Sequence, residues 1–444
     1  MTARLLLIAL DGADSNLIDR WSLDGTLPNV GALRARGAAH HIAAPDGATD
    51  DMLWANFQYA CGLGEHGRFN YMQRLSDGRM AMAILDETDR ERFWDGLSAS
   101  GKRIAILDIP KTAAPRPING IHLADWLVHG RYFRKPRSYP KELAREVVGN
   151  FGAAPKSYCD FHVDRDDAVR REQRDNLLRS AAMKERAGLD FLKREPWDFF
   201  AIAFKEGHCA GHNFWDLTDP AHPEFDSALN DRLGDPVRTI IRRLDAAVGK
   251  LVETAGLQAQ VLLFSTTKME PNASVGHFEP HMERHLNLAL AESRLSGAVR
   301  RLLKRSAPIE IMPYNENCTA IRVNRDGQAR EALLQDIESV FQDLSDAETG
   351  ERLTDRVLHP NRDYPGARAH QLPDLLVCYR AGHIPTSIES PRIGRIEAAA
   401  PTYRSGNHAC GPFIIGAGID VSGIARLEDI GGVVCRGLSG KPAL

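Results

Sequence analysis

The sequence lacks several features that define common protein classes. Its seven cysteines are odd in number and form no CxxC pair, which argues against a disulfide framework and a zinc ribbon. A formal net charge of −3 without a basic stripe argues against nucleic-acid binding. The first residues lack the apolar region and cleavage site of a signal peptide, and no run of about 18 apolar residues occurs. We therefore expect a cytoplasmic protein with reduced thiols and neither a nucleic-acid nor a membrane partner.

The chain contains short apolar runs that alternate with helical patterns. Its 444 residues, 43% of them hydrophobic, suffice for a large domain with a smaller partner. Apolar runs without polar alternation suit strands that are buried on both faces, so the alternation predicts an α/β fold with a largely parallel central sheet flanked by helices. The predicted strands are residues 4–10, 103–109, 199–204, 260–265, 374–380 and 412–419, and the predicted helices lie around 166–195, 236–255 and 329–344.

The region from 306 to 370 has a different pattern. It contains the segments "IEIMPY" and "CTAIRV" and one helix. This predicts a small α+β subdomain inserted at 306–370 into an α/β core of residues 1–305, with a return to the core at 371–444.

Polar residues follow several predicted strands directly. Asp11 comes after residues 4–10, Glu206 and His208 after 199–204, and the segment 266–268 ("TTK") after 260–265. His408 lies shortly before the last strand. Ligands of open α/β sheets bind beyond the carboxyl ends of the strands, so a site is expected where these residues gather.

His208 and His212 are the clearest metal-ligand candidates. They stand four residues apart, and on a helix this spacing puts both imidazoles on one face, within reach of one ion. His408 offers a third ligand. The alternative is that the histidines are unconnected and bonded to neighbouring backbone.

Other candidates also have ordinary structural interpretations. Asp11 could be a turn residue before Gly12, and Thr49 or Asp50 could cap a helix. The three histidines of residues 277–286 ("HFEPHMERHL") repeat every four positions. Because a proline fits the first turn of a helix, we expect a solvated helix start there and not a second metal site.

Several segments, in the correct order, resemble the type I phosphodiesterase/nucleotide pyrophosphatase branch of the alkaline phosphatase superfamily. The resemblance spans nearly the whole chain and implies an alkaline-phosphatase-like fold. It lies in "LLLIALDGAD", "LPNVGALRARG", "WANFQYACGLGEHGRFNY", "FWDGLSASGKRIAILDIP", "WDFFAIAFKEGHCAGHNFW" and "SGNHACGPFIIGAG".

The resemblance also implies a remodelled metal site. The family typically binds two zinc ions, one through Asp, His and His, the other through two Asp, one His and a Thr or Ser nucleophile. The first set would here be His208, His212 and His408, with His208 in place of Asp. In the second set Asp11 is retained.

The second set otherwise departs from the family pattern. Thr266 and Thr267 replace an Asp-His pair, and Lys268 follows. Hydroxyls are poor zinc ligands, so a second ion is not expected to bind tightly. Lys268 would put a positive charge in its place, neutralising Asp11 and Asp50 and facing an anionic substrate group. The nucleophile position falls on Asp50, with Thr49 adjacent.

We therefore predict a metal-dependent hydrolase or group transferase for a phosphoryl, sulfuryl or related ester of a small anionic substrate. One divalent ion is expected, zinc or alternatively iron or another transition metal. The attacking group would be a water molecule activated by the ion, or else the side chain of Asp50 or Thr49. A lyase or oxidative enzyme, or a non-catalytic binding or regulatory relative, is the alternative. Relatives with this fold lead us to expect a monomer or homodimer.

Overall fold

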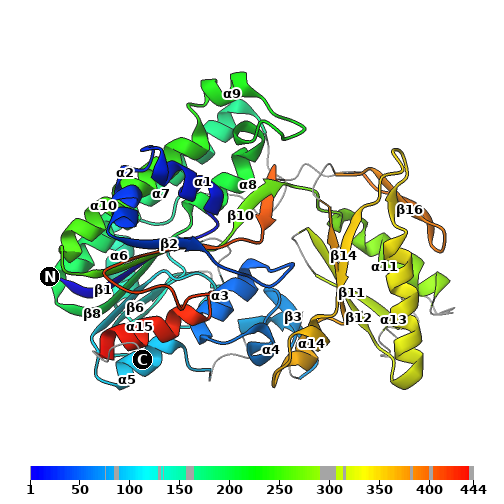
Figure 1. Cartoon of the computed structure of the whole chain (residues 1–444), viewed down its shortest axis with the longest axis horizontal. Coiled ribbons are helices and arrows are strands. Elements are labelled where there is room, and N and C mark those ends of the chain that lie inside the picture. Colours follow the sequence, from blue (N-terminus) through cyan, green and yellow to red (C-terminus); the bar gives the residue numbers. More distant parts are fainter. Residues whose placement is uncertain are drawn as a thin grey trace. The chain divides into compact units, whose positions relative to one another are not determined.

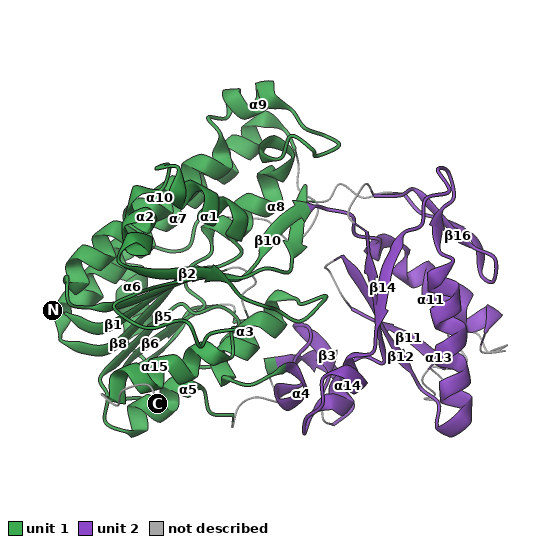
Figure 2. Cartoon of the chain, viewed as in Figure 1, with its two compact units in different colours: residues 1–62, 84–270, 403–444 green, residues 63–83, 271–402 purple. Residues whose placement is uncertain are grey.

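The chain forms two compact units (Figure 2). Unit 1 comprises residues 1–62, 84–270 and 403–444, and unit 2 comprises residues 63–83 and 271–402. The computed structural model describes residues 2–75, 77–84, 90–128, 132–133, 135–156, 165–290, 307–313, 317–380, 384–399 and 404–439.

An eight-stranded sheet forms the centre of unit 1, in the order β2-β19-β9-β1-β8-β5-β6-β7 (Figure 1). The pairs from β9 to β6 are parallel, whereas β19 is antiparallel to both neighbours and β7 is antiparallel to β6. The strands are β1 (Ala3–Leu10), β2 (Gly37–His41), β5 (Ile104–Leu107), β6 (Gly120–Ala124), β7 (Arg137–Tyr139), β8 (Trp197–Phe204), β9 (Gln260–Ser265) and β19 (Phe413–Ala417).

Both faces of this sheet are covered by helices (Figure 1). Alternate residues of β1 enter two apolar clusters, with Leu6 and Ile8 in one and Leu5 and Leu7 in the other. This burial on both faces explains why the strands are continuous apolar runs. The first face carries α1 (Ser15–Leu23), α2 (Pro28–Ala35), α6 (Leu143–Phe151), α7 (Asp167–Arg194), α8 (Glu206–Thr218) and α10 (Pro236–Ala255); the second carries α3 (Asp50–Tyr59), α5 (Phe93–Ala99) and α15 (Asp429–Ser439). A short helix, α9 (Ser227–Arg232), follows α8.

Unit 2 is built on a four-stranded sheet of order β11-β12-β15-β14, antiparallel throughout. Helices α11 (Glu279–Ala289) and α13 (Gly327–Gln342) share its apolar cluster. The sheet strands are β11 (Ile309–Met312), β12 (Cys318–Val323), β14 (Thr354–Leu358) and β15 (Leu375–Tyr379). Smaller elements are α4 (Leu63–His66), β3 (Met72–Arg74), β4 (Met80–Met82), β13 (Ser345–Asp346), α14 (Pro360–Asp363), β16 (Ser387–Ser390) and β17 (Gly394–Glu397).

The predicted α/β class with a largely parallel, helix-flanked sheet is confirmed. One strand differs in position: the run 374–380 was predicted as a return to the core, but β15 belongs to the sheet of unit 2. It is buried at all five positions, so its apolar pattern matches that of a core strand. Unit 2 is also wider than the predicted segment 306–370, and the predicted boundary at 305 and 306 lies outside the described residues.

Within the described part of the chain, no helix is both long and apolar enough to cross a membrane.

A buried ion pair links α7 to the main sheet. Lys184 Nζ lies 2.8 Å from Asp108 Oδ2, and both side chains are at most 2% exposed. The same Nζ donates to the carbonyl oxygens of Leu127 (3.0 Å) and Ala203 (2.8 Å). This ammonium group therefore joins α7 to β8 and to the segments that follow β5 and β6.

Replacing Lys184 with Met should lower the free energy of unfolding by about 3–5 kcal/mol, because the Asp108 carboxylate stays buried without its cation. Urea unfolding followed by circular dichroism measures this change. The matched control is Lys250→Met. Lys250 pairs with Glu185 at 2.8 Å but is 56% exposed, so its loss should cost less than about 1 kcal/mol. Equal effects of the two substitutions would contradict this account.

Candidate metal centre

Three histidines from two distant segments meet in unit 1. His208 and His212 lie on α8, which begins directly after β8, and His408 lies on the short strand β18 (Gly406–Ala409). The three ring centroids are 4.6 Å apart in every pair. All three residues are buried, and one ligand nitrogen of each lies within 4.8 Å of the others. The structure thus brings together the two histidines that the four-residue spacing pairs and His408, the candidate third ligand.

The tautomer of His212 is set by the backbone. Its Nδ1 lies 2.7 Å from the carbonyl oxygen of Gly406, so Nδ1 carries the proton and Nε2 keeps its lone pair. Burial lowers the pKa of His212 well below its usual value, and the nearby charge of Arg404 lowers it further. The imidazole is therefore neutral, which is the form that binds metals.

Asp50 faces this cluster from the first turn of α3. Its Oδ1 lies 3.2 Å from His408 Nδ1, and its Oδ2 lies 3.4 Å from His208 Nδ1. Adjacent ligand atoms of a tetrahedral zinc ion with bonds of about 2.0–2.1 Å are roughly 3.3 Å apart. The spacing of carboxylate and imidazoles thus matches the spacing that one ion requires.

Asp11 completes a second group with Asp50 and His208. Its Oδ1 accepts a hydrogen bond from Trp54 Nε1 (2.9 Å), and its Oδ2 lies 3.8 Å from His208 Nδ1. The following residue, Gly12, has a φ of +56°, and a Cβ there would lie 2.6 Å from the Cβ of His208. A glycine is therefore required for α8 to approach the end of β1.

The other predicted site residues have different surroundings. Thr49 is the N-cap of α3, its hydroxyl accepting from the backbone N–H of Met52 (3.2 Å). The Thr266 hydroxyl accepts from the backbone N–H of Gly12 (3.0 Å), and the Thr267 carbonyl accepts from the backbone N–H of Ser15 (3.0 Å). Both threonines thus hold the turn after β1.

Lys268, the first residue of β10 (Lys268–Pro271), lies near a third carboxylate. Burial raises the pKa of Asp14, and the positive charge of Lys268 is among the groups that oppose this rise. The structure places the charge of Lys268 close enough to act on Asp14. Its predicted neutralisation of Asp11 and Asp50 stays a prediction.

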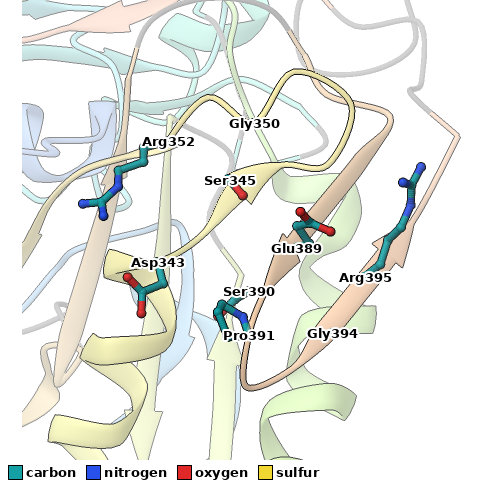
Figure 3. A pocket seen from close by; sticks show the side chains of 9 residues that line it. All are labelled: Asp343, Ser345, Gly350, Arg352, Glu389, Ser390, Pro391, Gly394 and Arg395. Carbon is teal, nitrogen blue, oxygen red and sulfur yellow. The ribbon is translucent and has the colours of Figure 1, made fainter.

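Two of the three histidines of residues 277–286 contact backbone carbonyl groups in unit 2. His277 Nε2 lies 3.1 Å from the Pro385 carbonyl oxygen, and His285 Nδ1 lies 2.9 Å from that of Ile393. Neither belongs to a metal-binding group within the described residues. Unit 2 also holds a separate cavity of about 580 Å³, lined by both acidic and basic side chains. Figure 3 shows Arg352 and Arg395 on opposite sides of it.

Three buried imidazoles with converging nitrogens, next to one carboxylate, are a donor set that fits a divalent transition metal. A model of the type I phosphodiesterase / nucleotide pyrophosphatase family matches residues 53–406. The chain belongs to this family. The predictions of the family and of a phosphodiesterase-like enzyme are therefore confirmed.

The solved structures show the same fold. Phosphonoacetate hydrolase from Sinorhizobium meliloti 1021 in complex with phosphonoacetate has a TM-score of 0.54 and 12% identity over 98% of this chain and 96% of that chain. The same enzyme in complex with phosphonoformate has a TM-score of 0.57 and 11% identity, with the same coverage. A search of curated proteins gave no match.

Two residues near the cluster were missed by the sequence reasoning. Arg404 Nη1 lies 3.3 Å from His212 Nε2, and Asn407 Oδ1 accepts from Arg404 Nη2 (2.8 Å) and from the backbone N–H of His408 (3.0 Å). Both residues stand in the segment "RSGNHACG", in which only the histidine was predicted as a site residue. The only sequence feature that could have pointed to them is that they closely precede His408, a candidate metal ligand.

Replacing His212 with Ala should weaken zinc binding by more than about 100-fold, because even an outer-shell partner of a zinc ligand is worth 10–100-fold in affinity. Competition with a chromophoric chelator, on protein purified without a histidine tag, measures the change. His285→Ala is the control, since His285 lies in unit 2 with its Nδ1 bonded to the Ile393 carbonyl oxygen. Undiminished zinc affinity in His212→Ala would remove this residue from the metal centre.

Proposed function

We propose that this protein is a metal-dependent hydrolase of phosphoryl esters on a small anionic substrate, with a single ion at His208, His212 and His408. The observation that carries the proposal is the convergence of three buried imidazoles, with ring centroids 4.6 Å apart, beside the Asp50 carboxylate. Family membership supplies the class of reaction. Zinc is the proposed metal because catalytic zinc is commonly held by three protein ligands, such as three imidazoles, with a fourth position open.

A bound divalent ion would supply a Lewis acid that polarises the phosphoryl oxygen. The protein side chains hold the geometry around it. Gly406 fixes the ring of His212 through Nδ1, and Trp54 fixes Asp11, whose other oxygen faces His208. Buried side chains with fixed partners need little rearrangement during the reaction, which favours catalysis.

Asp50 is the proposed general base. Its carboxylate faces the cluster and would accept the proton of an attacking water at Oδ1 or Oδ2. Thr49 is assigned a structural role because its hydroxyl caps α3. The proposed nucleophile is therefore water, and not the side chain of Asp50 or Thr49.

One ion is proposed in place of two because the second family set is incomplete in this chain. The Thr266 hydroxyl accepts from the backbone of Gly12, and hydroxyls are poor zinc ligands. Asp11 is then a positioning residue for His208. Transfer to an acceptor other than water, a cytoplasmic location and a monomeric or homodimeric state stay predictions from the sequence.

The proposed substrates are small anions. The structural neighbour was solved with phosphonoacetate and with phosphonoformate, each a compact molecule with two acidic groups. At 12% identity the likeness establishes the fold alone, so the choice of substrate needs direct assay. Bis(p-nitrophenyl) phosphate, p-nitrophenyl phosphate and phosphonoacetate form a suitable first panel.

Asp50→Asn should lower kcat of the zinc-loaded enzyme by about 100-fold or more, because the amide cannot accept the proton. Thr49→Ala should keep kcat within a few-fold and cost about 1 kcal/mol of stability through the lost helix cap. Steady-state hydrolysis of the best substrate in the panel, with zinc content measured on each variant, tests both. An inactive Thr49→Ala variant that still binds zinc would identify Thr49 as the nucleophile and contradict the proposal.

Direct attack by Asp50 would give an acyl-phosphate. Hydroxylamine intercepts such a species and leaves a hydroxamate on the side chain, which peptide mass spectrometry detects. A hydroxamate at Asp50 during turnover would replace the general-base role with a nucleophilic one.

A further inference from the structure

The guanidinium of Arg404 lies where His212 would bind a metal. Arg404 Nη1 is 3.3 Å from His212 Nε2, and Arg404 is buried, with 7% exposure. Because His212 Nδ1 is bonded to the Gly406 carbonyl, Nε2 holds the only lone pair of the ring nitrogens. This lone pair can accept one hydrogen bond from Arg404 or bind one ion.

We propose that Arg404 competes with the metal ion for His212 Nε2 and, once displaced, binds the anionic group of the ligand at that ion. Both parts rest on the metal site of the proposed function, and neither requires that the site hydrolyse an ester. Arg404 would then lower the affinity of the site for the metal and also recognise the negative charge of the substrate.

Asn407 would keep the guanidinium of Arg404 near the site after the metal displaces it from His212. Its Oδ1 accepts from Arg404 Nη2 (2.8 Å) and also from the backbone N–H of His408 (3.0 Å). The guanidinium is thereby tied to the strand that carries a metal ligand. Nη1 can leave His212 while Nη2 keeps its bond to Asn407, so the displaced guanidinium stays beside the ion.

Electrostatics then couples the metal to an anion. A divalent ion at the three imidazoles and the guanidinium of Arg404 repel each other across a buried site, where charges are weakly screened. An anion with several oxygens can contact both cations at once, since a guanidinium presents paired donors that suit phosphate. Metal and anion should therefore bind cooperatively, and the cooperativity should depend on Arg404.

The experiment measures zinc affinity by chelator competition, with and without inorganic phosphate, on the wild-type chain and the Arg404→Gln variant. Without phosphate, Arg404→Gln should bind zinc about tenfold more tightly, as expected when a hydrogen bond from a charged donor no longer competes. Phosphate should raise zinc affinity in the wild type several-fold and have little effect in the variant. Arg404→Lys, which keeps the charge, should retain part of the coupling.

The control is Arg36→Gln, which removes the same charge from an exposed guanidinium that donates to the Leu257 carbonyl. It should match the wild type in both measurements. Equal or weaker zinc binding by Arg404→Gln, or no zinc binding by either protein, would overturn the competition. Undiminished phosphate coupling in Arg404→Gln would overturn the role in anion recognition.

Neither readout requires turnover. A chain that binds zinc and phosphate as described but hydrolyses no ester would disprove the proposed hydrolase function and leave the competition at His212 standing.

Discussion

The register of three parallel strands is the constraint on which the site depends. Leu10, the last residue of β1, is paired with Phe204 on β8 and with Ser265 on β9, the last residues of those strands. The three strands therefore end at one level, and the segments that follow them begin side by side. The backbone N–H of Asp11 donates to Phe204 O (2.8 Å), and that of His208 donates to Asp11 O (2.9 Å).

Because of this register, the surroundings change from an apolar core to a polar site within a few residues of the strand ends. Below the strand ends, β1 and β8 are buried among apolar side chains; above them, Asp11, Asp50 and three histidines are buried as well. Burial of so many polar groups is costly unless each has a fixed partner or a shared ion. The cost explains why backbone contacts, such as that of His212 with Gly406, recur around the cluster.

The buried charges next to the site, Glu206 and Lys184, also have fixed partners. Glu206, the first residue of α8, accepts from the Ser180 hydroxyl at 2.5 Å, and Lys184 lies close enough to affect it electrostatically. Burial nonetheless raises the pKa of Glu206 above its usual value. Helix α8 thus begins on a buried polar network and carries two metal-ligand candidates on the next turns.

The main sheet and the pairing of His208 with His212 on one helical face could be predicted because their signals are local. Uninterrupted apolar runs follow from burial on both faces, and a four-residue spacing places two imidazoles on one helical face. The extent of unit 2 could not be predicted in this way. Met282 and Leu286 on α11 join its apolar cluster, but helical periodicity does not state which sheet a helix will cover.

Arg404 and Asn407 escaped prediction for a related reason. Asn407 lies on a strand of four residues, too short to show a period, and Arg404 lies just before it. The contact of Arg404 depends on the tautomer of His212, a residue 192 positions away along the chain. The role of Lys268 was inferred from its place after a strand, but that place does not determine which of several carboxylates the side chain approaches. The direction of a side chain at a strand end is determined by tertiary contacts, which the position in the sequence does not reveal.

The pairing of β10 with β18 has a consequence for how this chain could diversify. These strands lie at the two ends of the segment 271–402, and they are hydrogen-bonded to each other. A long insertion whose ends are fixed side by side can change in length or content with little effect on the core that holds it. Evolution could therefore replace most of that segment, and with it much of unit 2, while the strand that carries His408 stays in place.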